Sequence, residues 1–242
     1  LSASVRAGAP AWRSASLVLL AVAALAGVLN GQLRVVDPVA GALGAPRLAT
    51  FDRTATQMTG LDAADVAEFT TTQIGALANT QLLALTSTNM ASLSETQMAA
   101  IATIGVKVFT TTTFAAFAET QLAALSTTQV ASLTTSQLQA LNSTKFASFT
   151  ETQIGALTTS QVAAISTTNL SALDATQINA FRTTQLQTLS TTQLNGLTTT
   201  DIGELTTTQI GQLTTAQVRG ISTTNIGALS DTQVLALSTT QL

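Results

Sequence analysis

The sequence predicts an all-α solenoid built from about 23 tandem octapeptide units, and three observations support this fold class. First, residues 54–242 repeat the consensus Thr-Thr-Thr-Gln-Ile-Gly-Ala-Leu, with 23 complete units between residues 54 and 237. Second, the fifth and eighth positions of every unit are large and apolar. Third, eight of the ten acidic residues in this array occupy the first four positions of a unit, where the positive end of a helix dipole favours them.

The spacing of the apolar positions favours a separate short helix in each unit. Residues three apart lie on one face of a helix, whereas a strand would place its apolar residues two apart. One continuous helix is excluded, because eight residues rotate the apolar stripe by about 80° per unit and carry it round the rod. We therefore expect the chain to begin a new, very short helix in every octad.

The polar positions of the octad indicate where each helix begins. A capping residue opens the unit and Gln follows three residues later, as in Thr70 and Gln73, which is the spacing of a capping box. The sixth position is often Gly or Ala, and the seventh is Ala, Ser or Gly in 18 of 23 units, which would let neighbouring helices approach closely. Other residues replace Gln in a few units, and we interpret these as variation at a solvent-facing position: Asp65, Thr113, Lys145 and Asp201.

A single octad is too small to fold alone, so neighbouring units must stack to bury the apolar positions. A β-solenoid is the alternative architecture. It is supported by the Thr-rich composition and by residues 102–109 (ATIGVKVF), a strand-like unit that lacks the Gln. No period longer than eight residues is evident, so the number of octads in each superhelical turn stays open.

Residues 1–30 resemble a secretory signal. Arg6 and Arg13 precede an apolar run of about 13 residues, shorter than the roughly 20 of a membrane-spanning helix, and Ala24 and Ala26 have the spacing of a cleavage site. A helical cap on the array and an uncleaved membrane anchor are the alternatives. Residues 31–53 contain Pro38 and Pro46 and are predicted to form a linker or an irregular cap.

Composition excludes several classes of function. Charged residues are only 9% of the chain, and Cys, His and Tyr are absent, which removes disulfides and metal sites that need imidazole or thiolate. The array carries ten acids and four bases, so no basic patch is available to bind nucleic acid. We predict no catalytic, cofactor-binding or metal-binding residues.

The remaining candidates for chemistry have structural interpretations. The pairs Asp62/Asp65 and Asp201/Glu204 lie one helical turn apart but supply too few oxygens for Ca²⁺, so we interpret them as solvated acids at helix N-termini. Lys107 and Lys145 are the only lysines, and no Gly-x-Ser-x-Gly motif supports a nucleophile; we expect no enzyme. Phenylalanines replace core residues at the fifth or eighth position, and six of them are Phe109, Phe114, Phe117, Phe146, Phe149 and Phe181.

The pattern Leu-Thr-Thr-x-Gln-(Ile/Val)-x-Ala-Leu, seen approximately in residues 157–165 and 205–213, resembles tandem repeats of large bacterial surface proteins. Those proteins are often labelled exoproteins of adhesion or haem utilisation. The resemblance covers residues 54–242 and implies export and a surface or extracellular structural role. The haem label transfers poorly, because the usual axial ligands are reduced to Met58, Met90 and Met98 at the core-facing fifth position.

We therefore expect a non-enzymatic structural or adhesive rod, secreted or displayed on a bacterial cell surface. The alternative is a binding module that uses rows of Thr to bind ice or a glycan. Another copy stacked end to end at Leu242, or a surface polysaccharide, is the expected partner. Nucleic acid is not expected, and the membrane is involved only through the N-terminal segment during export.

Overall fold

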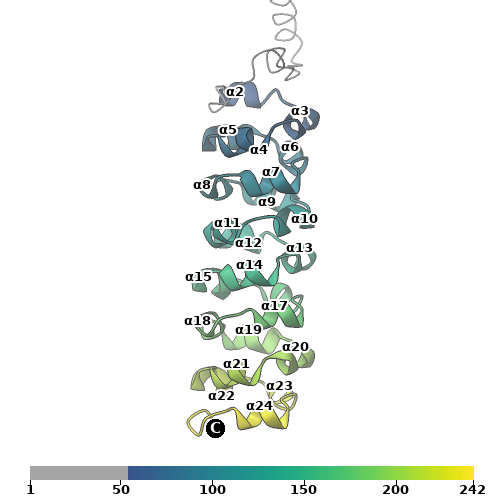
Figure 1. Cartoon of the computed structure of the whole chain (residues 1–242). Coiled ribbons are helices and arrows are strands. Elements are labelled where there is room, and N and C mark those ends of the chain that lie inside the picture. Colours follow the sequence, from purple (N-terminus) through teal and green to yellow (C-terminus); the bar gives the residue numbers. More distant parts are fainter. Residues whose placement is uncertain (1–53) are drawn as a thin grey trace, which may run out of the picture.

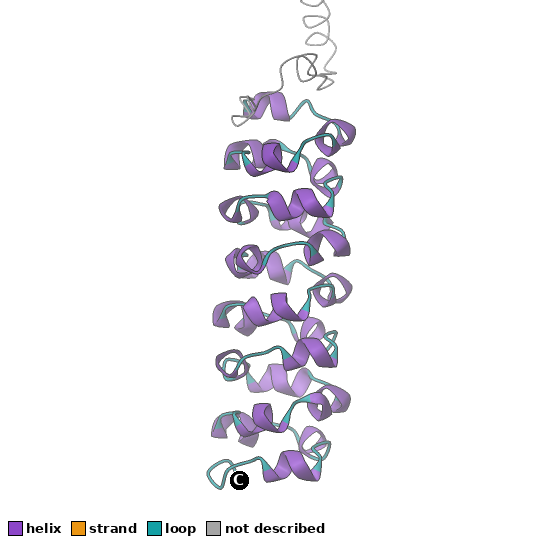
Figure 2. Cartoon of the chain, in the orientation of Figure 1, coloured by secondary structure: helices purple, strands orange, loops and turns teal. Residues whose placement is uncertain are grey.

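A computed structural model describes residues 54–242, and every regular element in that range is a helix (Figure 2). The prediction of an all-α solenoid is confirmed, and the β-solenoid alternative is wrong. Even the strand-like unit at residues 102–109 contains a helix, Thr103–Val106. The predicted signal segment at residues 1–30 and the linker or cap at residues 31–53 lie outside the described residues.

The helices are very short, with four to six residues each, and the described range contains one for each complete octad. In chain order they are α2 (Ala55–Met58), α3 (Ala63–Ala67), α4 (Thr71–Gly75), α5 (Asn79–Ala84), α6 (Ser87–Ala91), α7 (Glu95–Ala100), α8 (Thr103–Val106), α9 (Thr111–Ala116), α10 (Glu119–Ala123), α11 (Thr127–Ser132), α12 (Thr135–Gln139), α13 (Ser143–Ala147), α14 (Glu151–Ala156), α15 (Thr159–Ala163), α16 (Thr167–Leu170), α17 (Ala175–Asn179), α18 (Thr183–Leu186), α19 (Thr191–Gly196), α20 (Thr199–Glu204), α21 (Thr207–Gly211), α22 (Thr215–Gly220), α23 (Thr223–Ile226) and α24 (Asp231–Leu235).

The predicted capping box starts most of these helices. In α4, the backbone amide of Gln73 donates to the Thr70 hydroxyl at 3.2 Å, and the Thr70 amide donates to the Gln73 side-chain oxygen at 2.8 Å. Thr70 is extended, with φ −70° and ψ 158°, so the chain changes direction before each helix. The repeated cap therefore supplies both the start of each helix and the bend between neighbouring helices.

The fifth and eighth positions form one continuous core along the rod. All of these side chains from Met58 to Ile221 are buried, while those of the last coil, such as Ile226 and Val234, are partly exposed. The six phenylalanines belong to this core, as predicted, and edge-to-face contacts join Phe114 with Phe117 and Phe146 with Phe149. Apolar burial of this kind is the main force that holds the coils together.

The chain winds into a column of stacked coils (Figure 1), in which nearly every helix packs against the helix three places later. Hydrogen bonds between coils join residues that are most often 28 residues apart, for example Gln97 and Phe69. Since an octad has eight residues, one coil contains about three and a half octads. Each octad consequently lies across the boundary between two octads of the preceding coil.

The repeated Gln is buried between coils, so the prediction that it faces solvent is wrong. Its oxygen accepts the capping hydrogen bond, and its amide group donates to the carbonyl of the eighth-position residue 28 residues earlier. Gln129, only 1% exposed, donates to Ile101 at 2.7 Å. The same bond is made by Gln97, Gln121, Gln129, Gln137, Gln153, Gln161, Gln177, Gln185, Gln193, Gln209, Gln217 and Gln233.

Small residues at the sixth and seventh positions permit the close contact between coils, as predicted. A Cβ atom added to Gly211 would lie 2.9 Å from the carbonyl oxygen of Ala236, and one added to Gly155 would lie 3.2 Å from that of Ala180. Both pairs are 25 residues apart, so the glycine of one coil faces the backbone of the next. A larger residue at Gly211 would force the two backbones apart.

Candidate functional surfaces

Three acids of the predicted pairs lie at helix N-termini and act as caps, whereas the N-terminal prediction is wrong for Glu204. The Asp65 amide donates to the Asp62 carboxylate at 2.9 Å, and the Asp62 amide donates to Asp65 at 3.1 Å. Asp201 accepts from the Thr198 amide at 2.7 Å, whereas Glu204 is the last residue of the same helix. In the described range, no three residues of the type Asp, Glu, His or Cys come close enough to hold a metal ion.

The two lysines have different environments. Lys107 is exposed at the end of α8. Lys145 replaces Gln at the fourth position and donates its ammonium group to the Ala115 carbonyl, 30 residues earlier. Lys145 therefore takes over the donor role of the Gln, and its interpretation as variation at a solvent-facing position is wrong.

The pKa of Asp174 is lowered by local hydrogen bonds to its carboxylate. The hydrogen bond from the Thr176 hydroxyl, at 2.6 Å, and the one from the Gln177 amide, at 2.9 Å, lower the pKa of Asp174. Both bonds favour the ionised form. The shift belongs to the helix cap, so its consequence is structural.

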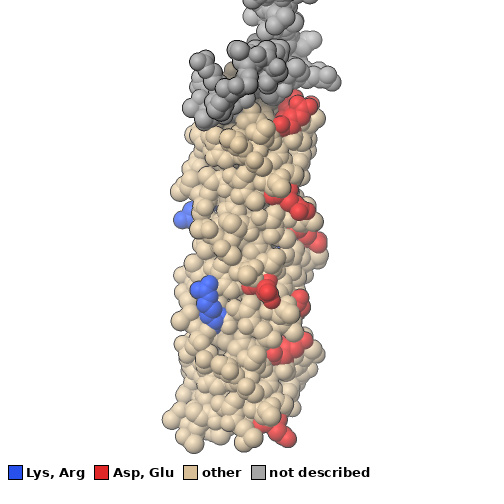
Figure 3. Space-filling view, in the orientation of Figure 1, with Lys and Arg blue, Asp and Glu red and all other residues tan. Residues whose placement is uncertain are grey.

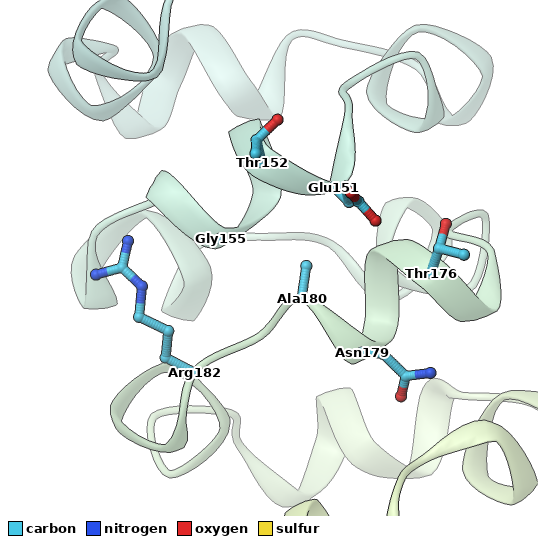
Figure 4. A pocket seen from close by; sticks show the side chains of 7 residues that line it. All are labelled: Glu151, Thr152, Gly155, Thr176, Asn179, Ala180 and Arg182. Atoms are coloured by element: carbon cyan, nitrogen blue, oxygen red, sulfur yellow. The ribbon is translucent and has the colours of Figure 1, made fainter.

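A groove between neighbouring coils is lined by residues of opposite charge (Figure 4). Its volume is about 520 Å³, and Gly155 and Ala180 line it where the two coils approach each other closely. Glu151 and Arg182 lie on different coils at its two sides. The lining therefore offers hydroxyl, amide, carboxylate and guanidinium groups to a polar ligand: Glu151, Thr152, Gly155, Thr176, Asn179, Ala180 and Arg182.

The Thr positions form interrupted rows on the surface of the rod. Because a coil has three and a half octads, the front half of an octad lies over the back half of the octad below it. Thus a Cβ atom added to Gly196, at a seventh position, would lie 2.6 Å from Thr167, at a second position. Along a line parallel to the rod axis, a Thr of one coil is therefore followed by a small residue of the next coil. The same position of the octad returns only in every second coil.

The acids of the array lie along one edge of the rod (Figure 3). If coils of 28 residues are counted from Gln57, every acid falls between the fifth and the twelfth residue of its coil. We call this set the acidic edge: Asp62, Asp65, Glu68, Glu95, Glu119, Glu151, Asp174, Asp201, Glu204 and Asp231. Sequence reasoning missed this alignment, because it appears only when the sequence is divided by the length of a coil rather than by the octad.

Comparisons with known proteins support a repeat protein. The model of a family described as the ALTTAQ repeat matches residues 133–167 and 183–215, both inside the octapeptide array. No curated protein matches the chain. Within residues 54–242, no helix is long and apolar enough to cross a membrane.

Proposed function

We propose that this chain is a non-enzymatic structural or adhesive rod, exported to a bacterial surface or secreted. The observation that supports a structural role is the ladder of buried Gln side chains, which joins successive coils along nearly the whole array. Gln97 and Gln233 bond to the preceding coil in the same way, although 136 residues separate them. A side chain repeated so uniformly serves the length and stiffness of the rod rather than one reaction centre.

The proposed location follows from the signal-like residues 1–30 and from the resemblance of the repeats to those of bacterial surface proteins. An antibody against residues 54–242 should label intact cells or detect the protein in the medium. Mass spectrometry of that material should show an N-terminus near residue 27. An intact chain found only inside the cell would contradict the proposed export.

The second candidate function is binding of a surface polysaccharide, and the groove at Glu151 and Arg182 favours it. Its hydroxyl and amide groups suit sugar hydroxyls, and the Arg182 guanidinium could bind a sugar carboxylate. Ice binding has less support, because the Thr rows are interrupted in every second coil. Uronic-acid oligosaccharides added to the isotope-labelled protein should shift the nuclear magnetic resonance signals of the Thr152 and Asn179 amides. The Arg182→Thr variant should show no such shift. The absence of a shift in both proteins would contradict glycan binding at this groove.

End-to-end association is a further proposal for the rod. The last coil exposes apolar side chains, including Leu235 at 84% and Leu242 at 77%. A second copy seated there would remove these side chains from water. Leu235→Ser with Leu242→Ser should then shorten any particles seen by electron microscopy, and particles of unchanged length would contradict this mode of association.

A further inference from the structure

We propose that these rods associate side by side, with the acidic edge of one copy against the opposite edge of the next. This inference extends the proposed structural role and does not depend on where the rod is located. Its first observation is the confinement of all ten acids of the array to one edge. The acids occur in each of the seven successive coils, so the edge is charged along the whole described length.

The second observation comes from the cations, which supply a complementary surface. Lys107 and Arg219 are both the 23rd residue of their coils, about half a turn from the middle of the acidic edge. They are 112 residues apart, which is four whole coils, and both side chains are exposed. Two rods in contact can therefore place each cation opposite a carboxylate of the neighbouring copy, since every coil carries at least one acid.

The side of the rod that carries Lys107 and Arg219 also exposes apolar side chains. Leu83 is 52% exposed and Ile104 is 63% exposed, and they belong to α5 and α8, which pack together on neighbouring coils. Both lie within a few residues of the position of Lys107 in the coil. The unit at residues 102–109 therefore departs from the octad consensus at the place where the rod combines exposed apolar and cationic groups. We call Leu83, Ile104, Lys107 and Arg219 the opposite edge.

The other two cations of the array lie outside the opposite edge. Lys145 is the fifth residue of its coil, at the border of the acidic edge, and its ammonium group donates to the Ala115 carbonyl of its own chain. Arg182 is the 14th residue of its coil, beside the groove and between the two edges. The net charge of the array is negative, but its two edges have opposite character.

The contact joins two different surfaces, so each rod can accept one neighbour and offer its other edge to the next. Such an association does not close at a dimer and continues into sheets or bundles. Each exposed ion pair contributes little by itself and is screened by salt. The association is therefore expected to be strong at low ionic strength and weak at high ionic strength.

Sedimentation velocity of the full chain tests the proposal at about 20 mM and about 0.5 M NaCl, which bracket weak and strong screening. We expect a concentration-dependent series of oligomers at low salt and a return to monomer at high salt. A monomer under both conditions would overturn the proposal. A monomer would not contradict the proposed role of the chain as a single structural rod. Failure of the side-by-side association can therefore be distinguished from failure of the proposed function.

A charge-relocation variant provides the matched control: E95T/E119T/E151T/T103E/T127E/T159E. Each carboxylate moves to the first helical residue of the next octad, so the net charge and the interaction with the helix N-terminus are preserved. The only change is the side of the rod on which each carboxylate lies, because its position in the 28-residue coil shifts by eight residues. We expect this variant to keep its helical circular dichroism and to lose the low-salt oligomers; oligomers equal to those of the unchanged protein would overturn the proposal.

The cationic side is tested by the K107T/R219T variant, with R182T as its control. Loss of the two cations of the opposite edge should abolish the low-salt oligomers. R182T removes one positive charge between the edges and should leave the oligomers in place. Oligomers that survive in K107T/R219T and disappear in R182T would assign the association to the groove and contradict the proposed contact.

Discussion

The side-chain amide of Gln129 donates a 2.7 Å hydrogen bond to the backbone carbonyl of Ile101, 28 residues earlier in the chain. The oxygen of the same side chain accepts from the Ser126 amide at 2.6 Å, which caps α11. One Gln side chain thus makes both a local hydrogen bond within its octad and a long-range hydrogen bond to the preceding coil. Its two hydrogen-bonding groups link the start of each helix to the stacking of the coils.

Gln129→Glu should strongly destabilise the rod at neutral pH. The carboxylate can still accept the capping bond, but it replaces the amide donor by an acceptor that faces the carbonyls of Met98 and Ile101. An unpaired buried charge and unsatisfied carbonyls should lower the free energy of unfolding by about 3 kcal/mol or more. Urea unfolding followed by circular dichroism measures this loss.

The exposed Gln139 supplies the control for that substitution. Gln139→Glu changes the charge by the same amount in the next octad, where the side chain bonds to the exposed carbonyl of Ala164 at 3.2 Å. Its effect should remain below about 1 kcal/mol, as is usual for surface substitutions. Equal losses in the two variants would show that net charge, and not the bond between coils, determines the result.

The octad alone was sufficient to predict each helix, because the relevant interactions are local. Thr70 and Gln73 are three residues apart and form the cap within one unit. The apolar fifth and eighth positions lie on one side of a single turn, so their burial also follows from the repeat. The same logic correctly assigned Phe114 and Phe117 to the core.

The length of a coil could not be predicted, and the errors in the candidate surfaces follow from that. The angle between successive helices determines how many residues complete one coil. The octad pattern is the same for any such angle, so it does not reveal this number. Without the 28-residue offset, Gln129 has no visible partner for its amide group. Lys145 and the alignment of the acids were misjudged or missed for the same reason.

Asp201→Gln should stabilise the rod by restoring a missing hydrogen bond between coils. Asp201 is buried at the Gln position and caps the Thr198 amide, but an ionised carboxylate has no donor for the preceding coil. The register places the Leu173 carbonyl where Gln side chains find their acceptor. We expect a gain of about 1 kcal/mol in the free energy of unfolding, measured by urea unfolding.

Lys145→Gln is the matched comparison for that gain. Lys145 already donates to the preceding coil through its ammonium group, so the substitution exchanges one donor for another. Its effect should be close to zero. A gain as large as that of Asp201→Gln would mean that Gln is favoured for its packing or helix propensity rather than for its donor.

Gly203→Ala and Gly211→Ala should change stability in opposite directions, although both glycines occupy the sixth position. A Cβ atom at Gly203 would lie 4.0 Å from the Ala228 carbonyl oxygen, which is an ordinary contact, whereas at Gly211 it would lie 2.9 Å from that of Ala236. Gly203→Ala should gain about 0.5–1 kcal/mol from helix propensity. Gly211→Ala should lose stability, because the clash is with backbone; thermal unfolding that moves both variants upward would contradict close packing at Gly211.

Asp174 should make the stability of the rod depend on acidic pH. The hydrogen bonds from Thr176 and Gln177 lower the pKa of Asp174 in the folded chain, so its ionised form stabilises the fold. This contribution is complete above the unfolded pKa, near 4, and is lost as the pH falls through the lower folded pKa. Asp174→Ser, which keeps a capping side chain, should therefore be less stable than the unchanged protein at pH 7.

The difference between these two proteins should shrink toward zero at about pH 2, where the Asp174 carboxylate is protonated. Thermal unfolding of both proteins across this range measures it. Thr176→Val removes the hydroxyl that contributes most to the shift, and it should reduce the pH dependence while leaving the backbone cap from Gln177 in place. A pH dependence that is unchanged in Thr176→Val would assign the shift to the helix N-terminus itself, because the backbone amides are then the only donors that act on Asp174.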